Sequence, residues 1–514
     1  LARAASPRDH VRMFKSGWMA SLFVLALASS SRCQEAAEEP AASNGPWVRD
    51  NELKVGGERL RYRSIVDHVP LRGGGDEVVA ELFHTAYFVL NDDGDPDPSR
   101  PLIFAYNGGP GSASYWLHMG VMGPKRVVTS EVGPQGAPPY PLEDNPACLL
   151  DVADIVMVDP VGTGLSRPVG DGKGADFWGV DEDARSLAEF VRRFLSRHGR
   201  WNSPRYLLGE SYGTTRSAVL ADRLQRDNLD LNGIVLVSAV LDFRTIQFAQ
   251  GDVIPFVVTV PSYAVTSAYH GVLPGGAPPD LAAFMQEVEV WARTDYATAV
   301  LAGSAVDPEH RRRVLAQMHR YTGLSEAYLD RSDLRVTASQ YEQQILNERG
   351  LVVGRLDARF TGPSGDVRSS RPSHDPQSTA ISSAYTSAFN AYLRNVLGYD
   401  GAREYVPGGR AGPWNWGRGD GGFGGGAVNV APDLARVLRR NPALEVLLVN
   451  GIYDLATPYY AAVWSLDNLN LPPTLRDNIH RADFAAGHMM YVEQSLLPQW
   501  RSALAAFLQR TSGR

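Results

Sequence analysis

Residues 206–213 read Tyr-Leu-Leu-Gly-Glu-Ser-Tyr-Gly, and this stretch decides the fold. A short apolar run at 206–208 leads straight into a Gly-x-Ser-x-Gly motif, and a helical pattern begins near Thr214. Strand, sharp turn and helix in that order are the requirements of a nucleophile elbow, which lifts the serine hydroxyl to the mouth of a sheet. The motif alone is a weak signal in a chain with 50 glycines. The interpretation of Ser211 as a nucleophile therefore depends on this context.

Apolar runs of the same kind recur along the chain, and helical patterns separate several of them. The runs lie at 102–106, 155–158, 234–237 and 446–449, and the helical patterns lie at 181–194 and 214–224. Runs this short and β-branched, separated by helices, indicate central parallel strands covered on both faces. Two alternating stretches at 59–66 and 78–90 predict antiparallel strands. The predicted fold class is α/β, with an open and mostly parallel sheet.

The alternation of strands and helices fails between residues 244 and 390. Helical patterns at 280–293, 310–321 and 378–393, without clear sheet strands, predict a mostly helical insertion over one end of the sheet. The core is then expected in two parts, at 47–243 and 391–514. The glycine-dense segment 408–426 contains aromatic residues, and it is interpreted either as a flexible loop or as the lining of a pocket.

Composition excludes several classes of protein. The chain has 514 residues, 44% of them hydrophobic and 21% charged, which is typical of globular proteins and not of disordered or fibrous ones. A net charge of −7 provides no basic field, so no nucleic-acid partner is expected. Two cysteines and the absence of a His-Glu-x-x-His motif argue against a metal site. The sequence indicates no cofactor and carries no signal for an oligomeric state.

Residues 1–46 predict an export signal followed by a disordered linker. From Met13 on, Lys15 precedes a short apolar run at 19–28 and then small residues, as in a cleavable secretory signal. A buried N-terminal helix is the alternative interpretation. Cys33 suggests a lipid anchor, although Arg32 stands where a lipoprotein signal has a small residue. No other apolar run is long enough to span a membrane, and the mature protein is expected to be periplasmic or secreted.

A serine hydroxyl needs a general base within hydrogen-bond reach and a third group that holds the base in place. In folds with a nucleophile elbow, the order along the chain is serine, acid, histidine. Asp454 lies just past the apolar run 446–449, at the carboxyl end of a predicted strand, and His488 follows in Ala-Ala-Gly-His-Met. A capping role for the aspartate and a structural role for the histidine are the alternatives.

The loop at 107–112 reads Asn-Gly-Gly-Pro-Gly-Ser and follows the run at 102–106 directly. A tight turn is one interpretation, because Asn-Gly commonly makes one. The other is an oxyanion loop, since only glycine lets backbone N–H groups approach a substrate so closely.

Five motifs in order resemble the serine carboxypeptidase family (peptidase family S10), in a bacterial-type form. They are Tyr-Asn-Gly-Gly-Pro-Gly-Ser at 106–112, Asp-Pro-Val-Gly-Thr-Gly-Leu-Ser at 159–166, Gly-Glu-Ser-Tyr-Gly at 209–213, Asn-Gly-Ile-Tyr-Asp at 450–454 and Ala-Gly-His-Met at 486–489. The similarity extends from about residue 55 to the end of the chain. It implies an α/β-hydrolase fold with a helical insertion, acting on the C-termini of peptides or proteins.

The resemblance also implies a role for each motif residue. It makes Ser211 the nucleophile, His488 the base and Asp454 its orienter. The N–H groups of Gly109 and Tyr212 would form the oxyanion hole. The terminal carboxylate of the substrate would bind to Asn107, the N–H of Gly108 and Glu210, and Met489 is a candidate wall of the substrate pocket.

Glu210 is expected to hold a proton, because two carboxylates near contact cannot both stay ionised. Binding should then favour mildly acidic pH. The alternative is a Glu210 paired with a buried arginine. The sequence also departs from the family, since a second glutamate that supports this site in better-known members corresponds here to Val121.

The sequence therefore predicts an exported serine carboxypeptidase that acts through an acyl-enzyme on Ser211. An esterase or acyltransferase with the same groups is the alternative among enzymes. A binding protein that keeps the fold without catalysis is the alternative from another class.

Overall fold

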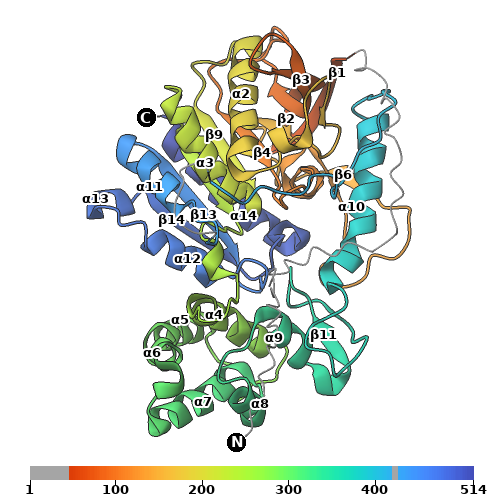
Figure 1. The fold of residues 1–514 in the computed structure, drawn as a ribbon. Helices are drawn as coiled ribbons and strands as arrows, with labels where there is room; N and C mark the ends of the chain where they lie inside the picture. The colour runs from red at the N-terminus through yellow and green to blue at the C-terminus, as the bar shows by residue number, and fades with distance from the viewer. Residues whose placement is uncertain (1–44, 419–425, 514) are drawn as a thin grey trace, which may run out of the picture. The chain divides into compact units, whose positions relative to one another are not determined.

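The computed structural model describes residues 45–418 and 426–513, which belong to one compact unit. The predicted export signal, most of the linker, Cys33 and Phe423 lie outside the described residues. Within them, ten strands form one sheet (Figure 1). Its order is β1-β2-β3-β7-β4-β9-β10-β13-β14, with β8 paired to β3.

The sheet has an antiparallel part followed by a parallel part. The antiparallel strands are β1 (Trp47–Val55), β2 (Glu58–Arg72), β3 (Val78–Val89) and β8 (Arg167–Pro168). The parallel strands are β7 (Asp154–Val158), β4 (Leu102–Tyr106), β9 (Arg205–Glu210), β10 (Gly233–Val237), β13 (Glu445–Gly451) and β14 (Ile479–Phe484). The predicted α/β class with a mostly parallel open sheet is confirmed.

Three strands of the sheet were not predicted: β8, which has two residues and pairs with β3, and the two strands β1 and β14 at the edges. The outer strand β1 has mostly exposed side chains, and β14 contains polar residues with intermediate burial. An edge strand is covered on fewer sides than a central one, so it needs no continuous apolar run. The apolar pattern therefore identified the central strands only.

Helices cover both faces of the sheet. The helices α2 (Val180–His198), α3 (Tyr212–Arg226) and α11 (Ala431–Arg440) pack with Leu207 of β9 in one buried cluster. The helices α10 (Pro376–Asn395) and α14 (Leu497–Ser512) pack with Tyr206 and Leu208 in another. Because successive side chains of a strand point to opposite faces, one apolar strand contributes to both clusters.

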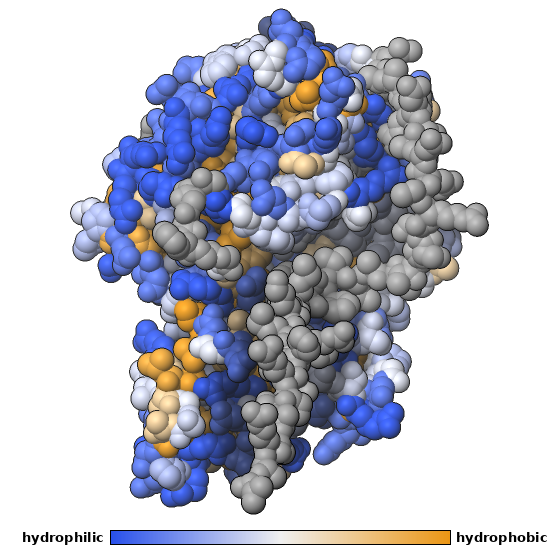
Figure 2. Space-filling view, in the orientation of Figure 1, coloured by the Kyte–Doolittle hydropathy of each residue, from blue (hydrophilic) through white to orange (hydrophobic). Residues whose placement is uncertain are grey.

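Six α-helices lie between β10 and β11 in the chain and form a third buried cluster. They are α4 (Ile254–Tyr269), α5 (Leu281–Trp291), α6 (Ala297–Ala302), α7 (Pro308–Thr322), α8 (Glu326–Arg331) and α9 (Ala338–Gln344). A small antiparallel pair, β11 (Leu351–Val353) and β12 (Thr361–Pro363), follows, where no clear strand was expected. Figure 2 shows apolar side chains gathered over α5 and α6, where Val290 and Leu301 are exposed.

The remaining elements are short. They are α1 (Tyr115–Leu117), α12 (Tyr459–Asp467), α13 (Pro473–Arg476), the pair β5 (Lys125–Val127) and β6 (Leu142–Asp144), and single turns η1 (His118–Met122), η2 (Gly174–Asp176), η3 (Phe243–Thr245), η4 (Ala292–Tyr296), η5 (Gly303–Ala305), η6 (Asn347–Arg349), η7 (Met490–Val492) and η8 (Gln494–Leu496). None of the helices that the structure describes is both long and apolar enough to cross a membrane.

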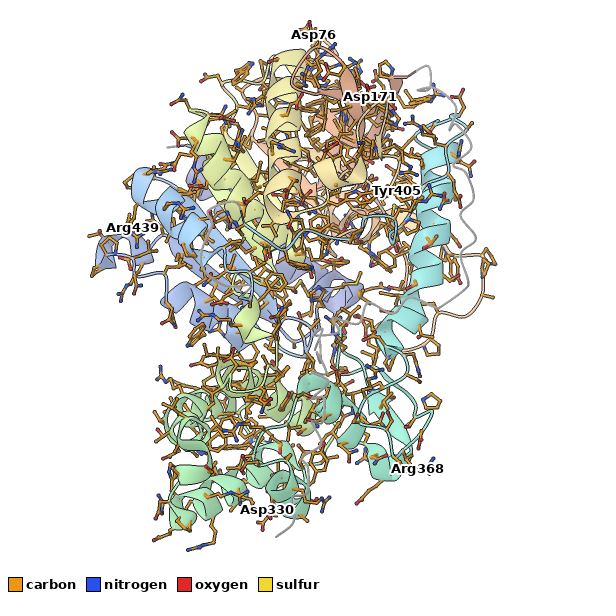
Figure 3. All side chains as sticks on the ribbon, viewed as in Figure 1. Asp76, Asp171, Asp330, Arg368, Tyr405 and Arg439 are labelled. Atoms are coloured by element: carbon orange, nitrogen blue, oxygen red, sulfur yellow. The ribbon has the colours of Figure 1, made fainter. Side chains whose placement is uncertain are left out.

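The segment after α10 returns across the sheet toward the elbow. Tyr405 packs its ring against Phe389 of α10, with centroids 4.4 Å apart (Figure 3). Farther along, the rings of Trp414 and Trp416 lie edge-on to Tyr212, at 5.4 and 6.0 Å. The described tryptophans of the glycine-dense segment thus pack beside the residue that follows Ser211.

A buried arginine joins the elbow helix to its neighbours. Arg216 of α3 donates from Nε to Asp183 of α2 at 2.6 Å and from Nη1 to the carbonyl of Asn107 at 2.6 Å. Its guanidinium lies between the rings of Tyr106 and Tyr212, 5.2 and 5.3 Å from their centroids. One cation therefore holds α2, α3 and the loop after β4 together.

We predict that Asp183→Ala lowers the free energy of unfolding by about 3–5 kcal/mol, because it leaves the Arg216 charge buried without its partner. Urea denaturation measures the change. The control is Glu52→Ala, which removes an exposed ion pair with Arg59 and should change stability by about 1 kcal/mol or less. Equal losses in the two variants would contradict a structural role for the buried pair.

Candidate active site

Ser211 occupies the sharp turn between β9 and α3. Its backbone has φ 60° and ψ −128°, a left-handed conformation that is costly for a residue with a side chain. Its N–H donates to the carbonyl of Val237 in the neighbouring strand at 2.9 Å. A Cβ on residue 209 would lie only 2.2 Å from the carbonyl oxygen of Gly213, so the turn needs glycine there. The predicted elbow has the expected strand, turn and helix.

Asp454 and His488 form a buried pair beyond the ends of β13 and β14. Oδ2 of Asp454 lies 2.7 Å from Nδ1 of His488. The other carboxylate oxygen accepts the N–H groups of Ala456 and Thr457 at 2.8 and 3.0 Å, so the aspartate cannot turn away from the ring. Burial disfavours the charged imidazolium, but the Asp454 carboxylate outweighs burial and raises the pKa of His488 above its ordinary value.

Strand β10 connects the serine to this pair. Val237, its last residue, accepts the Ser211 N–H, and the next residue, Ser238, donates from Oγ to the carbonyl of His488 at 2.7 Å. Within the described residues, no hydrogen bond joins the Ser211 hydroxyl to the His488 ring. The structure thus brings Ser211 and His488 to the end of the same strand, β10. The His488 ring in this structure is hydrogen-bonded to Asp454.

A segment after β11, which sequence reasoning missed, fastens both acid and base loops. The carbonyl of Arg355 accepts the N–H of Leu455 at 3.0 Å, and the carbonyl of Leu356 accepts the N–H of His488 at 2.6 Å. Asp357 accepts the N–H of Gly487 at 3.1 Å, and it is itself held by Arg359. These are mostly backbone contacts, which leave no motif in a single sequence.

The loop after β4 lies against the elbow. A Cβ on residue 108 would be 2.5 Å from the backbone nitrogen of Tyr212, and Gly109 has φ +104°, so both positions require glycine. Tyr212 is the first residue of α3, and its N–H therefore has no acceptor inside the helix. The loop therefore lies directly beside the backbone of Glu210, Tyr212 and Gly213 at the elbow.

The motif at 159–166 supports this loop. Asp159 accepts the N–H of Ser114 at 2.7 Å, and the hydroxyl of Ser114 accepts the N–H of Asn107 at 3.2 Å. Burial raises the pKa of Asp159 to about 6. A Cβ on residue 164 would lie 1.7 Å from the Asp159 carboxylate, which explains the glycine of the motif.

Glu210 and Asn107 form a second buried polar group beside the serine. Nδ2 of Asn107 donates to Oε1 of Glu210 at 2.8 Å, and the hydroxyl of Tyr491 donates to Oε2 at 2.8 Å. Burial raises the pKa of Glu210 to about 7, against the lowering influence of His488 and of these two donors. Within the described residues Glu210 has no arginine partner, unlike in the alternative interpretation.

Tyr491 was not among the predicted residues, because nothing in the sequence links it to Glu210. Val121, at the position of the missing glutamate, is buried and apolar. Met489 is 4% exposed and packs in the same cluster as Tyr491. Tyr491, from the loop that carries His488, therefore supplies the second hydrogen bond to Glu210.

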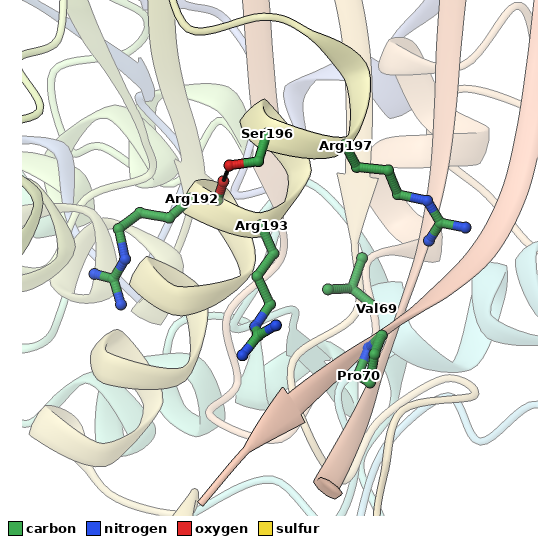
Figure 4. Close-up of a pocket in the computed structure, with 6 residues that line it drawn as sticks. All are labelled: Val69, Pro70, Arg192, Arg193, Ser196 and Arg197. Atoms are coloured by element: carbon green, nitrogen blue, oxygen red, sulfur yellow. Dashed lines mark hydrogen bonds between the residues drawn. The ribbon is translucent and has the colours of Figure 1, made fainter. Parts of the chain in front are cut away.

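A separate surface pocket of about 550 Å³ contains none of the predicted site residues (Figure 4). Val69 and Pro70 of β2 line it, together with Arg192, Arg193, Ser196 and Arg197 of α2. The three arginines pair with Asp227, Glu189 and Asp67 respectively. Their charge is thus already compensated within the protein. In the part of the chain that the structure describes, no three His, Cys, Asp or Glu side chains are grouped as metal ligands would be.

Residues 76–252 match the profile of the serine carboxypeptidase family, peptidase S10. Among solved structures, the chain is similar to Kex1, a prohormone-processing carboxypeptidase from Saccharomyces cerevisiae. The TM-score is 0.50 and the identity 16%, over 87% of this chain and 91% of Kex1. Proline iminopeptidase from Mycobacterium smegmatis gives a TM-score of 0.36 and 15% identity, over 87% and 99% of the two chains. No curated protein sequence matches.

The similarity to Kex1 and the sheet topology establish the α/β-hydrolase fold that the motifs implied. The segment that matches the family profile contains Asn107, Glu210 and Ser211, and it ends before Asp454 and His488.

We predict that Asp454→Asn lowers the pKa of His488, because a charge-assisted hydrogen bond is lost while burial remains. NMR of protein labelled with carbon-13 in its histidines measures the pKa, from the chemical shift of the His488 imidazole as a function of pH. A His488→Gln variant identifies that resonance. An unchanged midpoint in Asp454→Asn would mean that the carboxylate does not control the base.

Proposed function

We propose that this protein is an exported serine carboxypeptidase, which hydrolyses C-terminal peptide bonds through an acyl-enzyme on Ser211. One observation carries the proposal: the residue immediately before Ser211 is a buried glutamate that accepts a hydrogen bond from Asn107 and, among the described residues, forms no ion pair with a lysine or arginine. A carboxyl group in this environment has little use in folding, since its burial is unfavourable when ionised. It is suited to receive another carboxylate.

The proposal assigns one chemical role to each of these groups. His488 accepts the proton of the Ser211 hydroxyl as the oxygen attacks the carbonyl carbon of the scissile bond. The N–H groups of Gly109 and Tyr212 stabilise the oxyanion that forms. His488 then gives the proton to the leaving amine, the C–N bond breaks, and the acyl-enzyme remains. Water, deprotonated by His488, completes hydrolysis and releases Ser211.

Specificity for the chain end follows from Glu210. Below its pKa the group is a neutral acid that donates a hydrogen bond to the substrate carboxylate, while Asn107 and the N–H of Gly108 supply further donors. Above its pKa two negative charges oppose each other. His488 must be neutral to act as a base, so its titration limits activity on the acidic side. The two groups interact, and the apparent pKa values belong to the pair.

Export is part of the proposal and is supported by the signal-like pattern at 13–31. An esterase or acyltransferase would use the same serine, base and oxyanion donors. The carboxylate-binding group distinguishes the peptidase from these, because an ester substrate without a free carboxylate gains nothing from Glu210.

We predict that a fluorophosphonate probe labels the folded protein at Ser211, and that Ser211→Ala abolishes both labelling and peptide hydrolysis. Mass spectrometry of the labelled peptide identifies the site. The matched control is Ser217→Ala, six residues further along in α3, which should keep the label. Absence of labelling in correctly folded protein would favour a binding protein without catalysis.

We predict that kcat/KM for an N-blocked dipeptide with a free C-terminus falls about tenfold per pH unit above pH 7, because Glu210 ionises. The same dipeptide with an amidated C-terminus should show no such fall. In Glu210→Gln, which cannot ionise, the fall should disappear for the free acid too. Equal hydrolysis of free and amidated peptides at every pH would overturn the carboxypeptidase assignment in favour of an esterase-like enzyme.

A further inference from the structure

We infer that Tyr491 is a positioning residue of the carboxylate-binding site, which holds Glu210 so that its proton faces the C-terminal carboxylate of the substrate. This rests on the carboxypeptidase function proposed above. The site would then consist of three hydrogen-bonded side chains, Asn107, Glu210 and Tyr491, from three separate parts of the chain.

Each oxygen of Glu210 has its own donor. Asn107 holds Oε1 and the Tyr491 hydroxyl holds Oε2, both at 2.8 Å. The amide of Asn107 is fixed in this orientation, because its own Oδ1 accepts the N–H of Leu117 at 2.9 Å. Toward Glu210, Asn107 can therefore act only as a donor. Two donors at the ends of one carboxyl group set its plane and leave its acidic proton for an acceptor from outside.

The helical turn η1 is shaped to admit the tyrosine ring. A Cβ on residue 120 would lie 2.2 Å from Cδ2 of Tyr491, so the ring occupies the space that a side chain at 120 would take. The ring of Trp500 lies on another side, 6.2 Å away and nearly perpendicular. Val121, the neighbour of Gly120, is apolar and offers Glu210 no hydrogen bond. Close packing thus aims the hydroxyl at Glu210.

Tyr491 also ties recognition to the base. It follows His488 by three residues, in the single turn η7, and Glu210 precedes Ser211 by one. A shift of Glu210 would therefore be transmitted to both the serine and the histidine. Carboxylate binding and chemistry share one rigid arrangement of backbone.

Several charged or titratable groups face Glu210. His488 and Asp454 act on it from the two loops after β13 and β14, with opposite signs. Tyr385 of α10 is a further neighbour, although no hydrogen bond joins it to Glu210 in the described structure. Burial raises the pKa of the Tyr491 hydroxyl well above its ordinary value, so the group keeps its proton and donates at every pH of interest.

A donor to a carboxylate stabilises the ionised form. Removing the Tyr491 hydroxyl should therefore favour the neutral form of Glu210 and move its titration to higher pH. At the same time Glu210 loses the contact that orients it, so a substrate carboxylate should bind less well. If Tyr491 only packed against its neighbours, removing its hydroxyl would cause neither effect specifically with free-acid substrates.

Tyr491→Phe tests the inference, with the free-acid and amidated dipeptides over a pH series. We expect the upper pH limit of kcat/KM for the free acid to move up by about one unit. We also expect KM for the free acid at pH 5 to rise about three- to tenfold, with kcat little changed. Values for the amidated peptide should stay as in the wild type.

Tyr385→Phe is the matched control, since it removes a buried hydroxyl from a neighbouring helix without a bond to Glu210. Its pH limit should equal that of the wild type. If Tyr491→Phe also keeps the wild-type limit and KM while the wild type still prefers free acids, the inference is wrong and the carboxypeptidase function stands. If the wild type itself shows no such preference, the proposed function fails instead.

Gly120→Ala covers the case in which Tyr491→Phe does not fold. The added methyl group must displace the ring, so the hydroxyl moves off Glu210 while the tyrosine remains. The same upward shift and weaker free-acid binding are expected, and a wild-type profile in a folded Gly120→Ala protein would overturn the inference.

Discussion

The buried guanidinium of Arg216 is the constraint on which the site depends. It lies one turn into α3, binds Asp183 of α2 and the carbonyl of Asn107, and is enclosed by two tyrosine rings. Because a buried cation must keep its partners, these contacts fix the distance between the elbow and the loop after β4. The proposed oxyanion donors and the proposed carboxylate-binding residues Asn107, Gly108 and Glu210 come from those two segments, so the position of both groups depends on this one cation.

The order of the parallel strands determines which residues can meet. Strands β4, β9, β10, β13 and β14 are consecutive neighbours, and all present their carboxyl ends at one edge. Asn107, Ser211, Asp454 and His488 each follow one of these strands. The insertion adds the contacts of residues 355–359, which hold the acid and base loops together. The sheet brings the groups near one another, and the insertion restricts their movement.

The residues proposed for recognition and for chemistry are adjacent in the chain. Glu210 stands directly before the serine, and Tyr491 lies one turn after the histidine. The burial that makes the imidazole sensitive to Asp454 also raises the pKa of Glu210 to about 7. Glu210, Asp454 and His488 are all buried, but Glu210 has its own hydrogen-bond donors, Asn107 and Tyr491, while Asp454 and His488 bond to each other.

The sequence by itself determined the central strands and the elbow at Ser211, and it indicated Asn107, Glu210, Asp454 and His488 as candidate site residues. Apolar runs, glycine positions and local motifs report on neighbours in the chain, and these features are local. Tertiary structure alone decided the edge strands β1 and β14, the Arg216 junction, the contacts of residues 355–359 and the bond from Tyr491 to Glu210. Each of these joins segments far apart in the chain through side-chain geometry or backbone groups, and a single sequence records neither.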